Sequence, residues 1–319
     1  MPYQKFDRSQ LTIKPLSERE SDVSRDVLLY PGTPLPDFEN EDIVKLASAI
    51  RKSKDMGASV ILMMGAHVIR SGVGPLLIDL MREKYITHLA FNGAGAIHDF
   101  ELALAGVTTE SVARYISEGQ FGLWEEPAFI NDAVAAGVKD GLGMGEAIGK
   151  WICEHRFPYL ETSLFAAAYM QNVPITVHVG IGCDIIHEHP NCNGAALGQA
   201  SYTDFLIFTQ SIANLENGVF LNFGSAVTGP EVYLKALSMA RNVAGREGRK
   251  ISNFTTAVFD LHEIDPGEIH HEPERSNAFY YYRPWKTILL RTVADGGCSY
   301  YIQGRHRETI SALYRALAP

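Results

Sequence analysis

Hydrophobic residues along this chain gather in short runs that end on glycine. Four of these runs span 60–65, 89–95, 175–182 and 219–224, and each is followed, directly or after a short loop, by an apolar or amphipathic segment of helical length. A continuous apolar run is typical of a strand buried on both faces of a parallel sheet. Glycine at its end permits a tight turn and a close approach of the backbone to a ligand. Because open α/β sheets bind ligands at the carboxyl edge of their strands, the four turns predict a binding cleft.

Strands and helices alternate along most of the chain. Apolar periodicity predicts helices at 40–56, 73–85, 144–155, 162–172, 198–215 and 231–241, with one more at the C-terminus. Strands are expected at 59–64, 88–92, 174–179, 219–222, 253–260 and 299–303. Loop and short helix are expected at 106–139, and an acidic, histidine-rich loop at 260–276. This order is typical of an α/β fold with a doubly wound, mostly parallel sheet and helices on both faces.

The domain organisation is expected to be simple. Residues 1–36 are charged and irregular, and they predict an arm that packs on the body or on a neighbouring subunit. Residues 37–319 contain no composition break typical of a linker, so one α/β domain is expected. The first 25 residues are polar and charged, unlike a secretory signal, and four cysteines are too few for a disulfide framework. We therefore expect a cytoplasmic protein.

Charge and hydropathy narrow the range of partners. The chain carries a formal net charge of −9, whereas a nucleic-acid footprint needs clustered lysine and arginine. No apolar stretch reaches the roughly 18 residues that indicate a membrane span. The expected partner is a small molecule, and the acidic balance favours a cationic one such as a polyamine. Neither nucleic acid nor membrane is an expected partner.

The turn Asn92-Gly93-Ala94-Gly95 resembles half of a dinucleotide fingerprint. Amides of such a turn, with the N-terminus of the following helix, bind a pyrophosphate. The full G-x-G-x-x-G pattern is absent, because His98 stands where the third glycine belongs. A tight structural turn is the alternative interpretation. The segment 224–230 is a second candidate anion-binding nest, without the lysine of a P-loop.

A concentration of polar residues lies between 178 and 192. Its candidate metal ligands are His178, Asp184, His187 and His189. Three or four such groups that converge bind zinc, so a metal-dependent hydrolase is one alternative function. Their spacing matches no strong zinc pattern, and no metal cofactor is expected. A polar cleft loop with hydrogen-bonded histidines is the other interpretation.

Six segments resemble, in order and spacing, motifs of the deoxyhypusine synthase family. They are Ser71-Gly72, Asn92–Asp99, Ile181–Ile186, Leu221–Thr228, Thr256-Ala257 and Trp285. The resemblance covers about 59 to the C-terminus and rests on the order of the motifs. It implies a Rossmann-like fold, NAD in the carboxyl-edge cleft, and a homotetramer with sites at subunit interfaces. The family oxidises a polyamine with NAD and transfers an aminobutyl group through an imine on a lysine.

The resemblance also implies roles for individual residues. The NAD-contacting positions are Ser71, Asn92, Gly93, Ala94, Gly95, Gly224, Thr256 and Ala257. The substrate positions are Asp184, Trp285 and Asp99, and the candidate catalytic residues are Lys286, Asp184 and His98.

The chain also departs from the family pattern. Ile97 and His98 replace paired glutamates, and the lysine falls on Thr287, with Lys286 one residue early. Without a lysine at that point no covalent imine forms on the protein. The resemblance therefore implies an NAD-dependent transferase that dehydrogenates an amine or polyamine-like molecule and transfers an alkyl group, with its lysine lost or shifted. A non-catalytic binding homologue is a further alternative.

Overall fold

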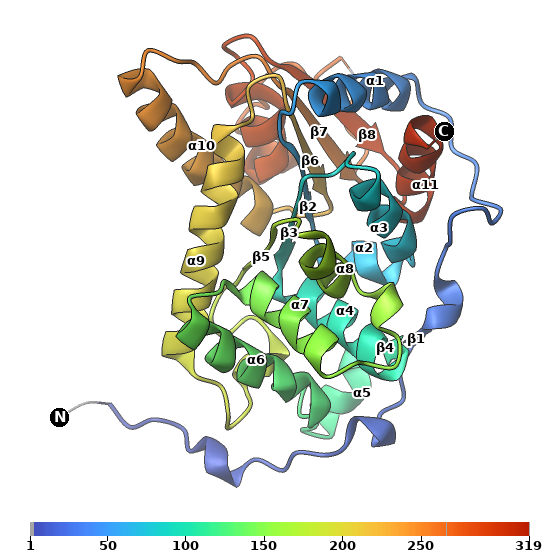
Figure 1. Cartoon of the computed structure of the whole chain (residues 1–319), viewed down its shortest axis with the longest axis vertical. Helices are drawn as coiled ribbons and strands as arrows, with labels where there is room; N and C mark the ends of the chain where they lie inside the picture. Colours follow the sequence, from blue (N-terminus) through green and yellow to red (C-terminus); the bar gives the residue numbers. More distant parts are fainter. Residues whose placement is uncertain (1–2, 266, 319) are drawn as a thin grey trace.

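Six parallel strands form the central sheet, which a computed structural model describes within residues 3–265 and 267–318 (Figure 1). They are β2 (Val60–Met64), β3 (His88–Asn92), β5 (Ile175–His178), β6 (Val219–Phe223), β7 (Thr255–Asp260) and β8 (Cys298–Gln303). Their spatial order is β5-β3-β2-β6-β7-β8. Counted along the chain, this is third, second, first, fourth, fifth and sixth, the order of dinucleotide-binding Rossmann sheets. The prediction of a doubly wound parallel α/β fold is confirmed.

Helices cover both faces of this sheet. One face packs against α1 (Glu41–Asp55), α3 (Gly74–Arg82), α4 (Gly93–Ala105), α7 (Met144–Glu154), α8 (Leu164–Gln171) and α11 (His306–Leu317). The other packs against α10 (Thr228–Arg246) and the C-terminal half of α9 (Gly194–Ala213), which lie together on the left of Figure 1. The remaining helices are α2 (Ala66–Arg70), α5 (Val112–Ser117) and α6 (Phe129–Gly137).

The apolar run of β2 divides its side chains between the two cores. Val60, Leu62 and Met64 pack into the first core, and Ile61 and Met63 into the second. Alternate residues of a strand point to opposite faces, so a strand covered on both sides must be apolar throughout. This is why the continuous runs in the sequence identify buried strands.

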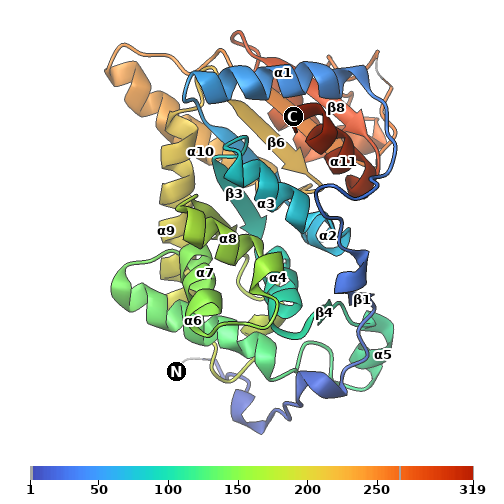
Figure 2. The same ribbon diagram turned by 45° about the vertical axis from the view of Figure 1, so that its right-hand side comes forward.

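The N-terminal arm lies along the body of its own chain. Its strand β1 (Val23–Ser24) pairs antiparallel with β4 (Val107–Thr108). Figure 2 shows the arm running past α5, β4 and α2. Near the start of the arm, Arg8 donates hydrogen bonds from Nη1 to the carbonyls of His189 and Cys192, at 2.9 and 3.0 Å. Packing of the arm on a neighbouring subunit stays a prediction.

Several boundaries differ from those that periodicity predicts. The helix expected from 198 begins at Gly194, because Asn193 Oδ1 accepts from the amides of Ala195 and Ala196 and caps it. Helix α10 is longer than the predicted 231–241 at both ends. A π-helical segment, Trp285–Arg291, was not predicted. None of the helices in the described part of the chain has the length and apolarity needed to span a bilayer.

Asp204 on α9 fixes the position of two neighbouring elements. Its Oδ2 accepts from the amide of Gly145 on α7 at 2.9 Å and from that of Val177 on β5 at 2.7 Å. The side chain is fully buried, and burial raises the pKa of Asp204 from 3.8 to about 8, against the opposing effect of these amides. The carboxyl group is therefore protonated in the folded protein at neutral pH.

This shift gives the stability a defined pH dependence. Between about pH 4 and pH 8 the unfolded chain has lost the Asp204 proton and the folded protein keeps it. The contribution of Asp204 to the free energy of unfolding therefore falls as pH rises. We expect the free energy of unfolding of wild type to fall by several kcal/mol across this window because of Asp204, and Asp204→Asn to lack this fall. Urea unfolding at a series of pH values measures the difference. Asp55→Asn, at an exposed site on α1, is the control, and equal pH slopes for wild type and Asp204→Asn would contradict the assignment.

Candidate functional site

A cavity of about 240 Å³ lies at the carboxyl edge of the sheet, beside β3 and β5. The start of α4, the end of α2, the loop after β5 and the N-terminal arm all contribute to it. Its charged and polar lining residues are Arg19, Arg70, His98, Glu101, Thr109, Glu110, Cys183 and Asp184. Its apolar lining residues are Ala94, Ile97, Val112, Phe121 and Ile185. Three of the predicted site residues therefore line one cavity, namely Ala94, His98 and Asp184.

Asp184 presents an unpartnered carboxylate oxygen beside the start of α4. A Cβ on Gly93 would lie 2.1 Å from Asp184 Oδ2, so only glycine permits this close approach. Oδ2 is buried and has no hydrogen-bond partner among the described residues. Burial raises the pKa of Asp184 to about 6, and the amide of Ala94 opposes the shift. An unpartnered buried oxygen of this kind is suited to accept a hydrogen bond from a ligand.

His187 lies next to this carboxyl group with a fixed tautomer. Its Nδ1 accepts from the amides of Gly182 and Asp184, at 3.1 and 3.2 Å, so the proton of the neutral ring is on Nε2. Nε2 is buried without a hydrogen-bond partner and lies 4.0 Å from Asp184 Oδ2. A donor and an acceptor thus face each other beyond direct hydrogen-bond range. Burial also lowers the pKa of His187, which favours the neutral ring.

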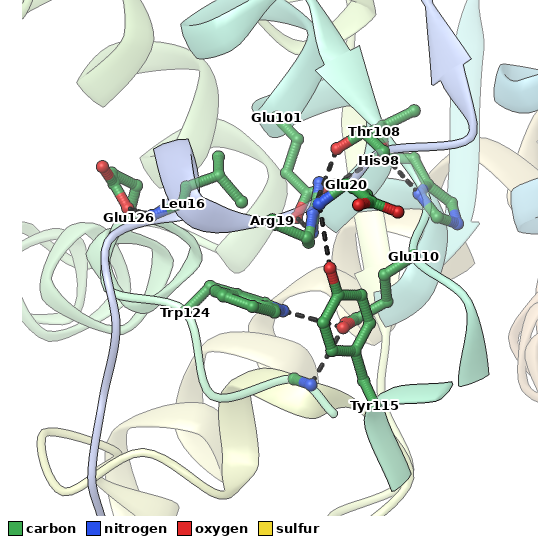
Figure 3. A network of polar contacts seen from close by, with 12 residues as sticks. Leu16, Arg19, Glu20, His98, Glu101, Thr108, Glu110, Tyr115, Trp124 and Glu126 are labelled. Carbon is green, nitrogen blue, oxygen red and sulfur yellow. Dashed lines mark hydrogen bonds and ion pairs between the residues drawn. The ribbon is translucent and has the colours of Figure 1, made fainter. Parts of the chain in front are cut away.

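A chain of hydrogen bonds fixes the tautomer of His98 (Figure 3). The Thr108 hydroxyl donates its proton to Glu101 Oε2 at 2.6 Å, and so it accepts from His98 Nδ1 at 2.7 Å. The neutral ring therefore carries its proton on Nδ1 and a lone pair on Nε2. Burial, followed by the charges of Arg70 and Arg19, lowers the pKa of His98 to about 4. The imidazole is neutral at physiological pH, and its Nε2 lone pair has no hydrogen-bond partner among the described residues.

Arg19 of the N-terminal arm anchors the other end of this chain. Its guanidinium donates to both carboxylate oxygens of Glu101, at 2.7 and 3.1 Å. The two side chains are 1% and 2% exposed, so the ion pair is buried. Figure 3 shows a second carboxylate below it, Glu110, which accepts from Trp124 Nε1 at 2.7 Å and from the Gly122 amide at 3.1 Å. The acids on this side of the cavity are therefore held in place by the protein itself.

The glycine turn after β3 acts mainly through its geometry. Asn92 Oδ1 accepts from the amide of Gly95 and caps α4, at 3.0 Å. A Cβ on Gly95 would lie 2.8 Å from the ring of Phe91. Gly93 makes room for Asp184, and Ala94 lines the cavity. This turn therefore shapes the cavity, and contact of its residues with NAD stays a prediction.

Ser71 and Gly224 lie outside this cavity. The Ser71 hydroxyl donates to the Val68 carbonyl at 2.7 Å, and its carbonyl accepts from Arg307 at 2.8 Å. Gly224 has φ +61°, and a Cβ there would lie 2.5 Å from Nε2 of His306. Gly224 follows β6 at the point where β2 and β6 adjoin, which is where the strand order reverses.

Thr256 and Ala257 lie inside the sheet and do not reach its edge. They are the second and third residues of the six in β7, and both are fully buried. The Thr256 hydroxyl donates to the Ile288 carbonyl at 2.9 Å. Asp99 is also structural in this fold, because it accepts from Ser163 Oγ and the Leu164 amide, at 2.5 and 2.8 Å. These three residues do not line the cavity, because packing and capping occupy their polar groups. Contact of Thr256 and Ala257 with NAD, and of Asp99 with substrate, stays a prediction.

Trp285 and Lys286 lie away from the cavity. Trp285 packs in the core on the α10 face of the sheet, and its Nε1 donates to the Ile269 carbonyl at 3.1 Å. Lys286 is buried, with Nζ 3.4 Å from the centroid of the Tyr280 ring, a cation–π contact. Thr287 is buried beside it. Ile97 of the cavity belongs to the core on the opposite face, so the structure does not bring Lys286 to His98 and Asp184.

The four candidate metal ligands do not converge. His178 Nε2 lies 3.1 Å from Thr176 Oγ1 within β5, and His189 Nε2 donates to the Gly122 carbonyl at 2.9 Å. Within residues 3–265 and 267–318, no group of three or more histidine, cysteine, aspartate or glutamate side chains is arranged to hold a metal ion. The metal-dependent hydrolase therefore has no metal site in the described part of the chain.

Sequence reasoning missed four charged residues of the cavity: Arg19, Arg70, Glu101 and Glu110. Arg19 lies in the arm, 82 residues before its partner Glu101, so no local pattern joins them. Arg70 directly precedes the Ser71-Gly72 pair, and Glu101 lies two residues after Asp99. Their proximity to these motifs was the available signal.

Comparisons with known proteins support the fold alone. No family model and no curated protein matches this chain. The solved structure of ArgZ, an arginine dihydrolase from the ornithine-ammonia cycle in cyanobacteria, is similar at 17% identity and a TM-score of 0.51, covering 88% of this chain and 33% of ArgZ. A conserved protein assigned to LOR/SDH from Methanococcus maripaludis S2 is similar at 14% identity and a TM-score of 0.51, covering 91% of this chain and 73% of that protein.

A protein from Entamoeba histolytica assigned as a deoxyhypusine synthase aligns at 7% identity over 86% of this chain and 87% of its own length, with a TM-score of 0.46. A likeness of this strength carries no argument. The chain spans about a third of the length of ArgZ, and the similarities establish a shared fold without a specific family. Membership of the deoxyhypusine synthase family therefore stays a prediction.

The buried Arg19–Glu101 pair predicts a large effect of removing one partner. Arg19→Gln leaves the Glu101 carboxylate buried without its counter-charge, and we expect a loss of about 3–5 kcal/mol in the free energy of unfolding. Urea unfolding followed by circular dichroism measures it. The control is Arg249→Gln, which breaks an exposed pair with Glu247 and costs at most about 1 kcal/mol. Equal losses of unfolding free energy for the two variants would show that the buried pair stabilises the fold no more than an exposed pair does.

Proposed function

We propose that this protein is an NAD-dependent enzyme that oxidises a carbon–nitrogen bond of a small amine in the cavity beside β3 and β5. One observation carries the proposal. At the carboxyl edge of a sheet with Rossmann strand order, an imidazole with a free Nε2 and an unpartnered carboxylate line one cavity. Such pairs of groups with opposite tendencies to hold a proton are typical of acid–base sites.

The residues at the reversal of strand order fit a dinucleotide. A Cβ on Gly65, after β2, would lie 2.8 Å from the Gly224 carbonyl, so the two strand ends approach this closely only with glycine at position 65. The following loop leaves Gly224, Ala226 and Val227 exposed before the N-terminus of α10. We propose that the loops at Gly65 and at 224–227 hold NAD, because a pyrophosphate is favoured at a helix N-terminus. NAD, when bound, accepts a hydride.

The residues of the chain then have distinct tasks. Asp184 binds the substrate ammonium through Oδ2, and His98 Nε2 receives the proton that the nitrogen loses. The carbon next to this nitrogen would lose a hydride to NAD held at these loops, so that the ammonium substrate would give a protonated imine, NADH and one proton. Thr108 and Glu101 keep His98 in the tautomer that accepts. The apolar side chains of Ile97 and Phe121 exclude water from one wall of the cavity.

The alkyl transfer that the family resemblance implies has less support. It needs a lysine amine at the substrate, and Lys286 stacks on Tyr280 in the opposite core. The proposal therefore ends at dehydrogenation. A homotetramer with shared sites and a polyamine substrate remain proposals that rest on the resemblance. A binding homologue without turnover is the second candidate, favoured by the displaced Lys286.

Binding of the cofactor is the first test. We expect NAD+ to raise the midpoint of thermal unfolding, because a ligand that binds only the folded state stabilises it. Differential scanning fluorimetry with NAD+, and with ATP as a comparison nucleotide, measures the shift. A protein that NAD+ neither binds nor stabilises would overturn the proposal.

Turnover tests the roles of the two side chains. We expect NADH formation from one member of an amine panel, and a loss of about 10²–10⁴ in kcat for His98→Gln. His155→Gln, at an exposed histidine on the protein surface, is the control. Since Asp184 acts as a carboxylate, kcat/KM should fall as pH drops through about 6, and Asp184→Asn should lower activity and remove this limb. NAD+ binding without turnover on any amine would favour the binding homologue.

A further inference from the structure

Arg70 is a cation without a counter-charge at the cavity. It is the last residue of α2, the helix that follows Gly65, and its side chain lines the cavity. Its guanidinium makes no ion pair or hydrogen bond with a described residue, and its Nε is buried without a partner. Arg19, the other arginine of the cavity, is fully engaged by Glu101. Arg19 therefore stabilises the fold through its ion pair, whereas Arg70 has no ion pair with a described residue.

An unpaired guanidinium in this position is costly for the protein alone. A buried donor without an acceptor has given up its hydrogen bonds to water and gains none from the protein in exchange. The positive charge of Arg70 also lowers the pKa of two neighbouring imidazoles, His67 and His98, as the cause next in size after burial. No acidic side chain of the cavity forms an ion pair with it among the described residues. Glu101 pairs with Arg19, Glu110 accepts from Trp124 and Gly122, and Asp184 lies near His187 instead. The missing partner is an anion.

The remaining charge of the cavity has the opposite sign. Asp184 Oδ2 is buried and unpartnered, and Ile97, Val112 and Phe121 contribute apolar wall. Among the described residues, the cavity thus offers one unpaired cation, one carboxylate with an unpartnered oxygen and an apolar surface, within about 240 Å³. A polyamine, which carries only positive charge, satisfies Asp184 and is repelled by Arg70.

We propose that the cavity binds an aliphatic amino acid, with its carboxylate on Arg70 and an ammonium on Asp184. A guanidinium fork matches a carboxylate in a bidentate contact. This inference deepens the proposed function and rests on it for the reaction, while the binding claim stands on Arg70, Asp184 and the cavity. It replaces the polyamine as substrate class with a molecule that carries both charges.

The test uses pairs of molecules that differ only in the carboxylate. Isothermal titration calorimetry measures Kd for L-ornithine against putrescine and for L-lysine against cadaverine, with and without NAD+. In at least one pair, we expect the amino acid to bind about tenfold or more tightly than its diamine, as a charged hydrogen-bonded contact predicts. Equal or tighter binding of both diamines, or no binding of either amino acid, overturns the inference.

Variants of Arg70 locate the effect. We expect Arg70→Gln to weaken amino-acid binding about tenfold or more and to leave diamine binding unchanged or tighter. Arg70→Lys should restore part of the affinity, since it keeps the charge and loses the fork. Arg246→Gln, which removes an exposed arginine from the end of α10, is the matched control and should change neither. Because Arg70 has no partner within residues 3–265 and 267–318, Arg70→Gln should unfold at no lower temperature than wild type, which separates loss of binding from loss of folding.

The same preparations separate the two proposals. If Arg70→Gln weakens NAD+ and leaves the amino acids unaffected, Arg70 holds a phosphate and the inference fails while the cofactor stands. If NAD+ does not bind and the protein binds the amino acids more tightly than the diamines as expected, the proposed reaction is wrong and the proposed ligand class is supported.

Discussion

The buried ion pair between Arg19 and Glu101 is the contact on which the cavity depends. It joins the N-terminal arm to α4 across 82 residues of sequence, and both side chains are withdrawn from water. A lone charge at this depth would be strongly unfavourable, so each partner requires the other. Glu101 in turn accepts from Thr108, which accepts from His98. The protonation pattern of the candidate base is thus set by an arginine that enters from the beginning of the chain.

Glycine has different physical tasks at the strand ends. Gly93 gives Asp184 access to the start of α4, which is a requirement of the site. Gly65 permits β2 to end in contact with the backbone after β6, Gly224 makes room for the His306 ring, and Gly95 avoids the Phe91 ring. A glycine-rich turn therefore predicts that something approaches closely, without saying whether it is a ligand, a carboxylate or another strand.

Charge at the cavity is divided between engaged and free groups. Arg19, Glu101 and Glu110 are engaged by the protein, whereas Arg70 and Asp184 have unpartnered polar atoms. A count of charges in the sequence, net −9, favours a cationic ligand. The arrangement favours a molecule with charges of both signs, because only unpaired groups remain available to a ligand.

The sequence alone determined the fold class and the edge of the sheet at which the cavity lies. Continuous apolar runs such as Val60–Met64 identify strands covered on both faces, and this constraint is local. Sequence also singled out Ala94, His98 and Asp184, which lie shortly after β3 and β5 and line the cavity, while their roles stay predictions. Only the tertiary structure decided that Thr256 lies inside the sheet, that Lys286 packs in the opposite core, and that Arg19 and Arg70 reach the cavity. The reason is physical: which polar groups find partners depends on contacts between distant segments, and the strand pattern does not encode them.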